Sequence, residues 1–282
     1  MPRKAKRYTS AMKKIPLIIL FLCLFCSFEQ ASKAQDRSIN DPLTAEDRIY
    51  EREFALGGML HTGGFGIAAQ WVKIKNIYTK TVREISIMDM HHSKEDRQQS
   101  GLAKGRNAAK SYLYGKQNSL YVLDASVGKV RMIAEKARRS GVSLGVYYGG
   151  GISLGLVKPY YLEIIKPSDT GLYTTEAIRY TPETDSLFLD QQRIYGAAGF
   201  SYGWKELQFH PGINLKAGLN FDWASYQEFV KAVEMGVSVH GFLPEIGGLF
   251  KGEFSGISLM INEDNSYFYA NLYLRLLFGK RW

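Results

Sequence analysis

The sequence predicts an all-β protein, an eight-stranded antiparallel transmembrane β-barrel with long outer loops. Several segments after residue 34 alternate bulky apolar residues with small or polar ones, which is the period of a β-strand. These segments run about 10–16 residues, enough for a tilted membrane strand of about 9–11 and longer than the usual soluble strand. Short and long connections alternate between them, as expected when one end of a barrel has tight turns and the other has loops.

Residues 1–34 are predicted to be a signal peptide. Lys13 and Lys14 precede the apolar run 15–28, which is too short for a membrane-spanning helix of about 20 residues. Ser32-Lys33-Ala34 supplies small residues for cleavage after Ala34, and Met12 is an alternative start with the same form. Residues 35–53 are then an N-terminal periplasmic segment, and residues 54–282 form the barrel.

The net charge of +9 is mostly a property of the predicted signal peptide. Residues 1–34 hold seven basic side chains and one acidic side chain, whereas the remaining chain holds 29 basic and 26 acidic ones. This distribution argues against a nucleic-acid partner, which would need a basic face on the folded part. Both cysteines, Cys23 and Cys26, lie in the signal peptide, so no disulfide is expected in the mature chain. A lipid anchor at Cys26 is not expected because Leu24 and Phe25 are not small.

Segment 142–157 is the clearest strand. Its even positions are mostly bulky and apolar, its odd positions are mostly glycine and serine, and neither face carries a charge. A strand facing water would carry charged or polar side chains, so the apolar face is expected to meet lipid and the small residues to face a narrow lumen. The other predicted strands are 54–61, 64–75, 79–91, 119–132, 213–223, 231–240 and 267–278.

Connection lengths and aromatic residues support the same orientation. Connections 76–78, 133–141 and 224–230 are short, whereas 94–117, 158–212 and 244–265 are long and are expected to face outward. The turn around Thr62-Gly63-Gly64 would be the one short outer connection. Aromatic girdles at the membrane surfaces are predicted from residues near strand ends, namely Trp71, Trp223, Tyr160, Phe278 and Trp282.

Polar residues on the predicted lumen face should form a network. An eight-stranded barrel is just wide enough for its own side chains, so buried charges of both signs should pair there. The predicted lumen set is Asp124, Lys216, Asp222, Glu234, His240, Asn271 and Arg275, with Tyr273 beside it. The main interpretation is a structural plug, and a proton or ion path is the alternative. The run 149–151 of three glycines is expected to bend a strand or leave lumen space.

Four segments carry a resemblance to a known family. YGKQNSLYVL (114–123), GLVKPYYLEII (155–165), HPGINLKAGLNFDW (210–223) and LYLRLLFGKRW (272–282) resemble a group of small, porin-like outer-membrane barrel proteins of Bacteroidota. The resemblance spans most of the mature chain. It implies the barrel fold and the cell outer membrane as location, and it implies no catalytic or binding residue.

The sequence favours no catalytic, metal or cofactor site. His91 and His92 are expected at the outer end of strand 79–91, where adjacent residues point to opposite faces and cannot easily share a metal. A membrane-embedded lipid or ester hydrolase or acyltransferase using His91, His92 and Ser93 is kept as an alternative. No nucleophile-elbow motif supports it.

The long connection 158–212 is the most informative segment for function. Structureless loops of this length are uncommon unless they are functional, and its aromatic residues are typical of interfaces. It is expected to cap the barrel or to dock a partner, through Tyr160, Tyr161, Tyr173, Tyr180, Phe188 and Trp204. The leading hypothesis is therefore a non-enzymatic, non-porin barrel that acts by structure or interaction, as an accessory subunit of an outer-membrane assembly or secretion complex. Its expected partners are outer-membrane lipids and other outer-membrane proteins, with a narrow channel as a further alternative.

Overall fold

The computed structural model describes residues 50–76, 78–100, 110–134, 142–167, 173–224, 228–244, 256–261 and 266–282, without the side chains of Pro167 and Tyr173. The predicted signal peptide, the cleavage site and most of the predicted periplasmic segment lie outside these residues. Residues 48–282 form one compact unit.

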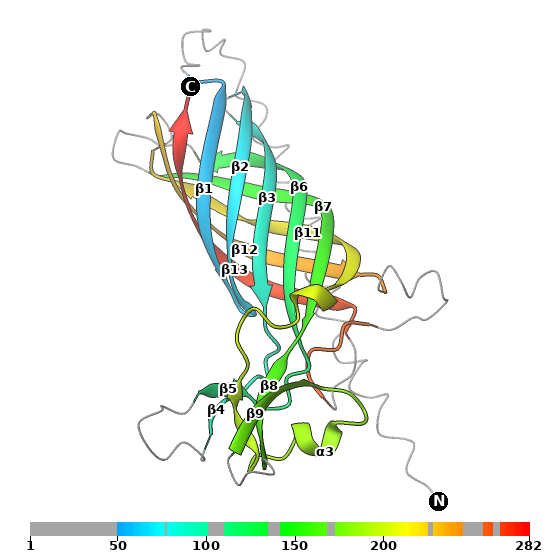
Figure 1. The fold of residues 1–282 in the computed structure, drawn as a ribbon. Coiled ribbons are helices and arrows are strands. Elements are labelled where there is room, and N and C mark those ends of the chain that lie inside the picture. The colour runs from blue at the N-terminus through cyan, green and yellow to red at the C-terminus, as the bar shows by residue number, and fades with distance from the viewer. Residues whose placement is uncertain are drawn as a thin grey trace, which may run out of the picture. The chain divides into compact units, whose positions relative to one another are not determined.

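Eight strands form a closed antiparallel barrel (Figure 1). Each strand pairs with its neighbour in the chain, and the first strand pairs with the last. This confirms the predicted fold class. The barrel strands are β1 (Arg52–His61), β2 (Gly64–Asn76), β3 (Thr79–Met90), β6 (Asn118–Ala134), β7 (Ser143–Pro159), β11 (Gln208–Asp222), β12 (Phe229–Phe242) and β13 (Phe268–Arg281).

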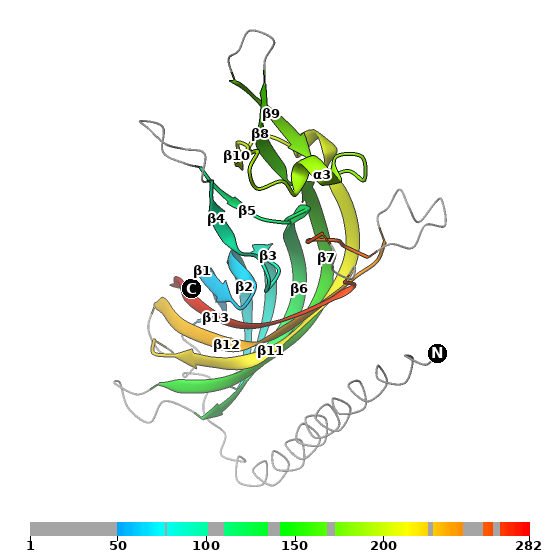
Figure 2. The ribbon, with the colours of Figure 1, turned by 90° about the horizontal axis from the view of Figure 1, so that it is seen from below.

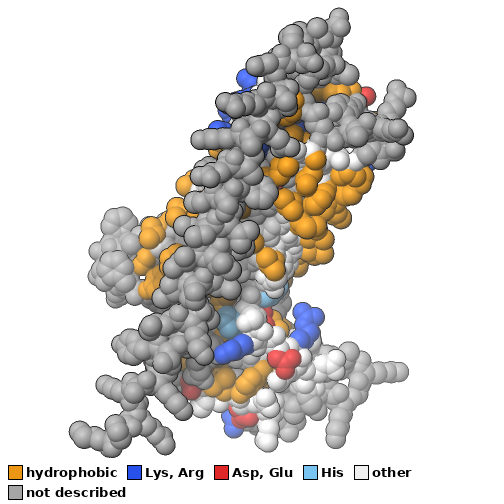
Figure 3. Space-filling view, turned by 180° about the vertical axis from the view of Figure 1, so that it is seen from behind, with side chains coloured by type: hydrophobic (Ala, Val, Ile, Leu, Met, Phe, Trp, Pro, Cys, Tyr) orange, Lys and Arg blue, Asp and Glu red, His pale blue; other side chains and the backbone are white. Residues whose placement is uncertain are grey.

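The barrel has a polar interior and an apolar exterior. In β7, Ser143 and Ser153 are buried, whereas Ile152 is 69% exposed. The same alternation in β11 buries Asn214 and Lys216 and exposes Ile213 and Leu215. Hydrophobic side chains gather on the barrel wall, and the charged side chains visible on this face lie toward its two ends (Figure 3). An exterior of this kind is stable only against lipid, so the barrel spans a membrane.

Three long connections leave the same end of the barrel, which we call the outer end. They contain short strands outside the barrel: β4 (Arg97–Gln99), β5 (Ser111–Leu113), β8 (Tyr161–Pro167), β9 (Tyr173–Arg179) and β10 (Ile194–Ala197). They also contain the helices α3 (Asp185–Phe188) and η2 (Trp204–Glu206). Strands β10, β8 and β9 form one sheet and β4 and β5 form another (Figure 2). We call these elements the outer lobe. Among the described residues, no helix is long and apolar enough to cross a membrane.

Several strand boundaries differ from the sequence prediction, and two of them change where candidate residues lie. Strand β11 begins at Gln208, five residues before the predicted start at residue 213. Pro211 and Gly212 look like strand breakers in the sequence, but both pair in register with β7. Strand β3 ends at Met90, so His91 and His92 lie in the following connection and not on the strand.

Candidate functional site: a filled lumen and a folded outer lobe

A network of buried ion pairs fills the middle of the barrel. Glu84 binds Arg275 through two hydrogen bonds, of 2.5 Å and 3.0 Å, and accepts a third from Lys216 at 2.8 Å. Lys216 also contacts Asp124 at 2.9 Å, and Asp124 lies 3.0 Å from the Nε2 atom of His240. All five side chains are almost completely buried. Five different strands contribute one residue each, so the network ties the barrel wall together across the lumen.

Neutral polar groups complete the central network. Glu234 accepts a hydrogen bond from the Tyr273 hydroxyl at 2.9 Å and lies 3.4 Å from Arg275. Gln70 donates to Glu84 at 2.9 Å, and Ser153 donates to Asp124 at 2.7 Å. Buried charges are costly unless they are paired and hydrogen-bonded. These contacts pair the charges, although Arg275 Nε and His240 Nδ1 have no hydrogen-bond partner among the described residues.

A second network lies toward the end of the barrel opposite the outer lobe. Arg281 binds Glu53 at 2.9 Å and Asp222 at 2.5 Å, and it also donates to the carbonyl oxygen of Ala224. Lys80 contacts both carboxylates, at 3.3 Å and 3.5 Å. The sequence prediction placed Asp222 with Asp124 and Lys216, but the structure places it in this separate cluster.

The predicted lumen residues therefore fall into three groups. Asp124, Lys216, Glu234, His240 and Arg275 meet in the central network, and Asp222 belongs to the second one. Asn271 lies near the outer end, where its side-chain oxygen accepts a hydrogen bond from Thr62 at 3.1 Å.

Sequence reasoning missed four charged members of the two networks, namely Lys80, Glu84, Arg281 and Glu53. Glu84 has the same alternation as the predicted residues, because Ile85 and Ile87 are exposed around it. Arg281 lies an even number of residues after Arg275 and so on the same inward face of the strand, but the predicted strand ended at residue 278. Glu53 was assigned to the periplasmic segment instead of to β1. Longer strands would have identified the last two.

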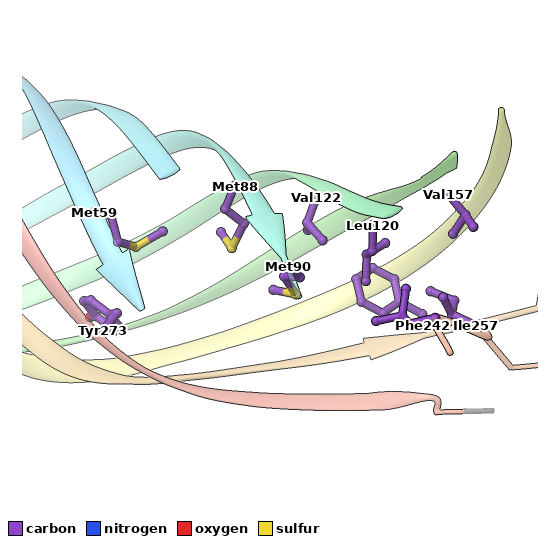
Figure 4. Packing of buried hydrophobic residues seen from close by; sticks show 10 residues of the cluster. Met59, Met88, Met90, Leu120, Val122, Val157, Phe242, Ile257 and Tyr273 are labelled. Atoms are coloured by element: carbon purple, nitrogen blue, oxygen red, sulfur yellow. The ribbon is translucent and has the colours of Figure 1, made fainter. Parts of the chain in front are cut away.

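The outer end of the lumen contains a cluster of buried apolar side chains. The side chain of Ile257, from the connection between β12 and β13, packs among inward-facing residues of the barrel (Figure 4), and Leu259 of the same connection belongs to the same cluster. Both are 3% exposed. The barrel residues of this cluster are Met59, Met88, Met90, Leu120, Val122, Val157, Phe242 and Tyr273. We call residues 256–261 the plug segment.

The plug segment is held by hydrogen bonds to residues 115–118. Backbone N–H groups of Gln117 and Asn118 donate to the Leu259 carbonyl at 2.8 Å and 3.3 Å. The Asn118 side chain donates to the Ser258 carbonyl at 2.7 Å. These hydrogen bonds hold the plug segment against residues at the start of β6.

The outer lobe has a hydrophobic core of its own. Tyr112, Leu162, Phe188 and Ile194 are buried together, and Tyr160 and Tyr180 pack against them. The hydroxyl of Tyr160 accepts a hydrogen bond from the backbone N–H of Leu113 at 3.1 Å. Burial raises the pKa of Tyr160 above its usual value. The described parts of the connections between β3 and β6 and between β7 and β11 thus fold together as a small structured unit.

One face of the lobe exposes aromatic side chains. Phe200, Tyr202 and Trp204 are 67%, 47% and 42% exposed. The rings of Phe200 and Trp204 lie over the ammonium group of Lys158, at 4.1 Å and 5.1 Å. Trp204 also stacks on Tyr121 of β6, with ring centroids 6.2 Å apart. We call residues 199–206 the aromatic segment.

The predicted interaction residues have different environments. Trp204 is exposed, and Tyr161 is half-buried and donates to Glu206 at 2.8 Å. Phe188 is completely buried in the lobe core and cannot present its ring to a partner. Tyr160 and Tyr180 pack against the same core, so Tyr160 is not part of a lipid girdle. The side chain of Tyr173 lies outside the described part of the chain. Sequence reasoning missed the exposed residues Phe200 and Tyr202.

The histidines of the hydrolase alternative do not form a catalytic triad in the structure. His91 lies 3.2 Å from Asp89, and its other ring nitrogen contacts the Gly63 carbonyl. Ser93 is exposed, and in the described residues no hydrogen bond joins its hydroxyl to His91 or His92. The same residues contain no group of three potential metal ligands.

No protein-family model matches this chain, and no curated protein matches its sequence. Solved structures match it at the level of fold. A major outer membrane protein from Thermus thermophilus is 10% identical, with a TM-score of 0.42, over 83% of this chain and all of that chain. Ail of Yersinia pestis, in complex with the heparin analogue sucrose octasulfate, is 9% identical, with a TM-score of 0.31, over 82% and 97%. The N-terminal β-barrel domain of Pseudomonas aeruginosa OprF is 10% identical, with a TM-score of 0.28, over 83% and 98%. The closed barrel, with its apolar wall and polar lumen, is itself that of an outer-membrane β-barrel protein.

Proposed function

We propose that this chain is a non-conducting outer-membrane barrel that acts by protein interaction, as an accessory subunit of a larger outer-membrane assembly. The observation that carries the proposal is a filled and capped lumen beneath a folded lobe that exposes aromatic side chains. A barrel built for transport needs a continuous polar path. The apolar side chains of Ile257 and Leu259 among the inward-facing residues at the outer end support the non-conducting state.

The aromatic segment is the proposed contact surface for the partner. Aromatic residues are enriched at the centres of protein interfaces, where they bury large areas at a small entropic cost. Trp204 stacks on Tyr121, which belongs to the outward-facing set of β6. A partner that reaches Trp204 therefore lies beside the outer end of the barrel wall, as another protein at the membrane surface would.

Substitution of the exposed aromatic residues tests this proposal. The variant Phe200→Ser/Tyr202→Ser/Trp204→Ser should lose a partner that cross-links to the full chain and co-purifies with it from outer membranes. Loss of such anchors typically costs about 2 kcal/mol or more each, so capture should fall by at least about tenfold. The measurement is quantitative mass spectrometry of the captured proteins.

A matched variant changes exposed polar residues of the same lobe. Glu183→Ser/Gln191→Ser/Gln192→Ser should capture the same proteins as the unmodified chain, since these side chains lie outside the aromatic segment. Both variants must show the heat-modifiable gel shift of a folded barrel. Equal capture by the aromatic variant and the unmodified chain would contradict the proposal.

Planar bilayers test the non-conducting state. The purified chain should insert without producing discrete channel openings, because ion pairs fill the lumen and the plug segment covers it. Reproducible single-channel steps that are absent from detergent controls would instead favour the narrow channel.

We also infer membership of the Bacteroidota group of small outer-membrane barrels. Support comes from the four resembling segments. Two of them contain residues at the outer end of the barrel, and a third lies mostly in β11, next to β7. Residues 115–118 bind the plug segment, residues 155–165 join β7 to the lobe, and β11 contains residues 210–222.

A further inference from the structure

A basic patch lies on the outward face of four neighbouring strands, at the end of the barrel opposite the outer lobe. Its members are exposed side chains on β1, β2, β3 and β6, namely Arg52, Lys73, Lys75, Arg83, Lys129 and Arg131. The strands are adjacent in the order β1, β2, β3, β6 around the barrel. We call this set the basic patch.

The strand register places these residues side by side. Arg52 is directly opposite Lys73, and Lys73 and Lys129 both lie opposite Thr81. Arg83 lies opposite Trp71 on one side and Val127 on the other, so it forms the next row toward the apolar wall. The patch is therefore a continuous surface a few residues across.

The patch has few carboxylates to balance it. In the described residues, the cations of Arg52, Lys73, Arg83, Lys129 and Arg131 form no ion pair. The acidic residues Glu53, Glu84 and Asp124 of the same strands point into the lumen and are paired there. Glu51, just before β1, is an exposed carboxylate near the patch, and its single negative charge does not neutralise the six cations.

The opposite wall carries fewer cations near this end: Lys231 on β12 and Lys280 on β13 are exposed there, and Lys280 pairs with Glu228 at 2.7 Å. In the described parts of β7 and β11 near the same end, the outward residues are uncharged, as shown by Val146, Tyr148, Leu219 and Phe221. In the described residues, cations without a carboxylate partner are thus more numerous on β1, β2, β3 and β6 than on the opposite wall, where Lys231 is such a residue. A uniform ring would indicate general solvation at the membrane surface, whereas a one-sided patch indicates a binding surface.

Aromatic residues show that the patch lies at the membrane interface. Trp71 is 46% exposed, and its ring lies 5.4 Å from that of Phe54 on the neighbouring strand. Tryptophan is enriched where lipid headgroups meet the hydrocarbon region. Beyond Trp71, toward the outer end of β2, the outward residues Ile67 and Phe65 are apolar and exposed. Lysine and arginine at this depth can extend to the headgroup phosphates.

We propose that the basic patch binds the phosphate headgroups of anionic phospholipids in the periplasmic leaflet of the outer membrane. Arginine matches phosphate with paired hydrogen bonds, and lysine adds a compact charge. The acyl chains would lie along the apolar wall above Trp71. This binding holds lipid on one side of the barrel and is separate from the protein contact at the outer lobe.

Fluorescence quenching of Trp71 tests the proposal on the full chain. In a background of Trp204→Phe/Trp223→Phe/Trp282→Phe, Trp71 is the single tryptophan of the four in the chain. The folded protein is placed in phosphatidylcholine vesicles containing a minor share of phosphatidylglycerol with brominated acyl chains. The reference is brominated phosphatidylcholine at the same share. The ratio of the two quenching curves gives the preference for the anionic lipid.

The expected result is preferential quenching by phosphatidylglycerol that depends on the patch. Each cation near the membrane surface contributes up to about fivefold in affinity. The variant Lys73→Gln/Arg83→Gln/Lys129→Gln should therefore lower the preference by at least about tenfold or abolish it. The control Lys166→Gln/Arg193→Gln/Lys205→Gln removes the same charge from the outer lobe and should leave the preference unchanged.

Two outcomes would overturn the proposal. Equal quenching by the two lipids in the parent protein would show that the patch does not select anionic lipid. The occupant of the patch would then be an acidic protein surface. An equal loss in the patch variant and the lobe control would show an effect of net charge alone. Neither outcome depends on the captured partner of the aromatic segment, so the two proposals can fail separately.

Discussion

Replacing Glu84 by alanine should lower the free energy of unfolding by about 3–5 kcal/mol, the range for removing one partner of a buried ion pair. Glu84 is the counter-ion of both Arg275 and Lys216, at 2.5 Å and 2.8 Å. All three side chains are at most 1% exposed. Without Glu84, two cations share the remaining carboxylates Asp124 and Glu234, and Gln70 loses its acceptor.

Urea-induced unfolding in lipid vesicles, followed by tryptophan fluorescence, measures this change. Glu176→Ala is the matched control, because it breaks a glutamate–lysine pair in which both side chains are about half exposed. Exposed pairs contribute about 0–1 kcal/mol, so the control should change little. Glu84→Gln keeps the side-chain volume but removes the charge. It should lower the free energy of unfolding by nearly as much as Glu84→Ala. A change below about 1 kcal/mol for Glu84→Ala would show that the central network is not a structural element.

The eight strands were predictable because a membrane barrel imposes one simple pattern on each of them. In β12, Val233 to Val239 alternate with Glu234 to His240, and only one assignment of faces puts the charges away from lipid. The predicted lumen residues were those on the polar face of the same alternating strands. Errors arose where a strand continued past a misleading residue, as at Pro211 in β11 or after Phe278 in β13.

The plug and the lobe were not predictable, because they depend on contacts between distant connections. Ile257 and Leu259 are two apolar residues in a long loop, and nothing in their spacing indicates that they close the lumen. Phe188 and Trp204 look equally suited to an interface in the sequence. Packing buries the first in the lobe core and exposes the second.

The substitution Gly151→Val should prevent the barrel from closing, because it adds a β-carbon where β6 and β7 lie close together. The sequence indicated that glycines 149–151 bend a strand or leave lumen space. The structure shows close backbone approach between β6 and β7: a β-carbon at Gly151 would overlap the Ala125 carbonyl oxygen and lie 2.6 Å from the Cα atom of Ser126. Gly149 and Gly128 make room for the buried ring of Tyr147, whose hydroxyl would lie 3.0 Å from a β-carbon on either residue.

Backbone atoms of a paired strand cannot move aside as a flexible side chain can. Gly151→Val should therefore cost at least the roughly 3 kcal/mol at the upper end of overpacking, and the compact, heat-modifiable species should be lost from gels. Gly58→Val is the matched control, since Gly58 also lies on a barrel strand, in β1, but a β-carbon there meets no atom within 4 Å. Its outward side chain would face lipid, so folding should be retained. If both variants fold equally well, then β6 and β7 are not as close as the structure places them, and the ring of Tyr147 must have another position.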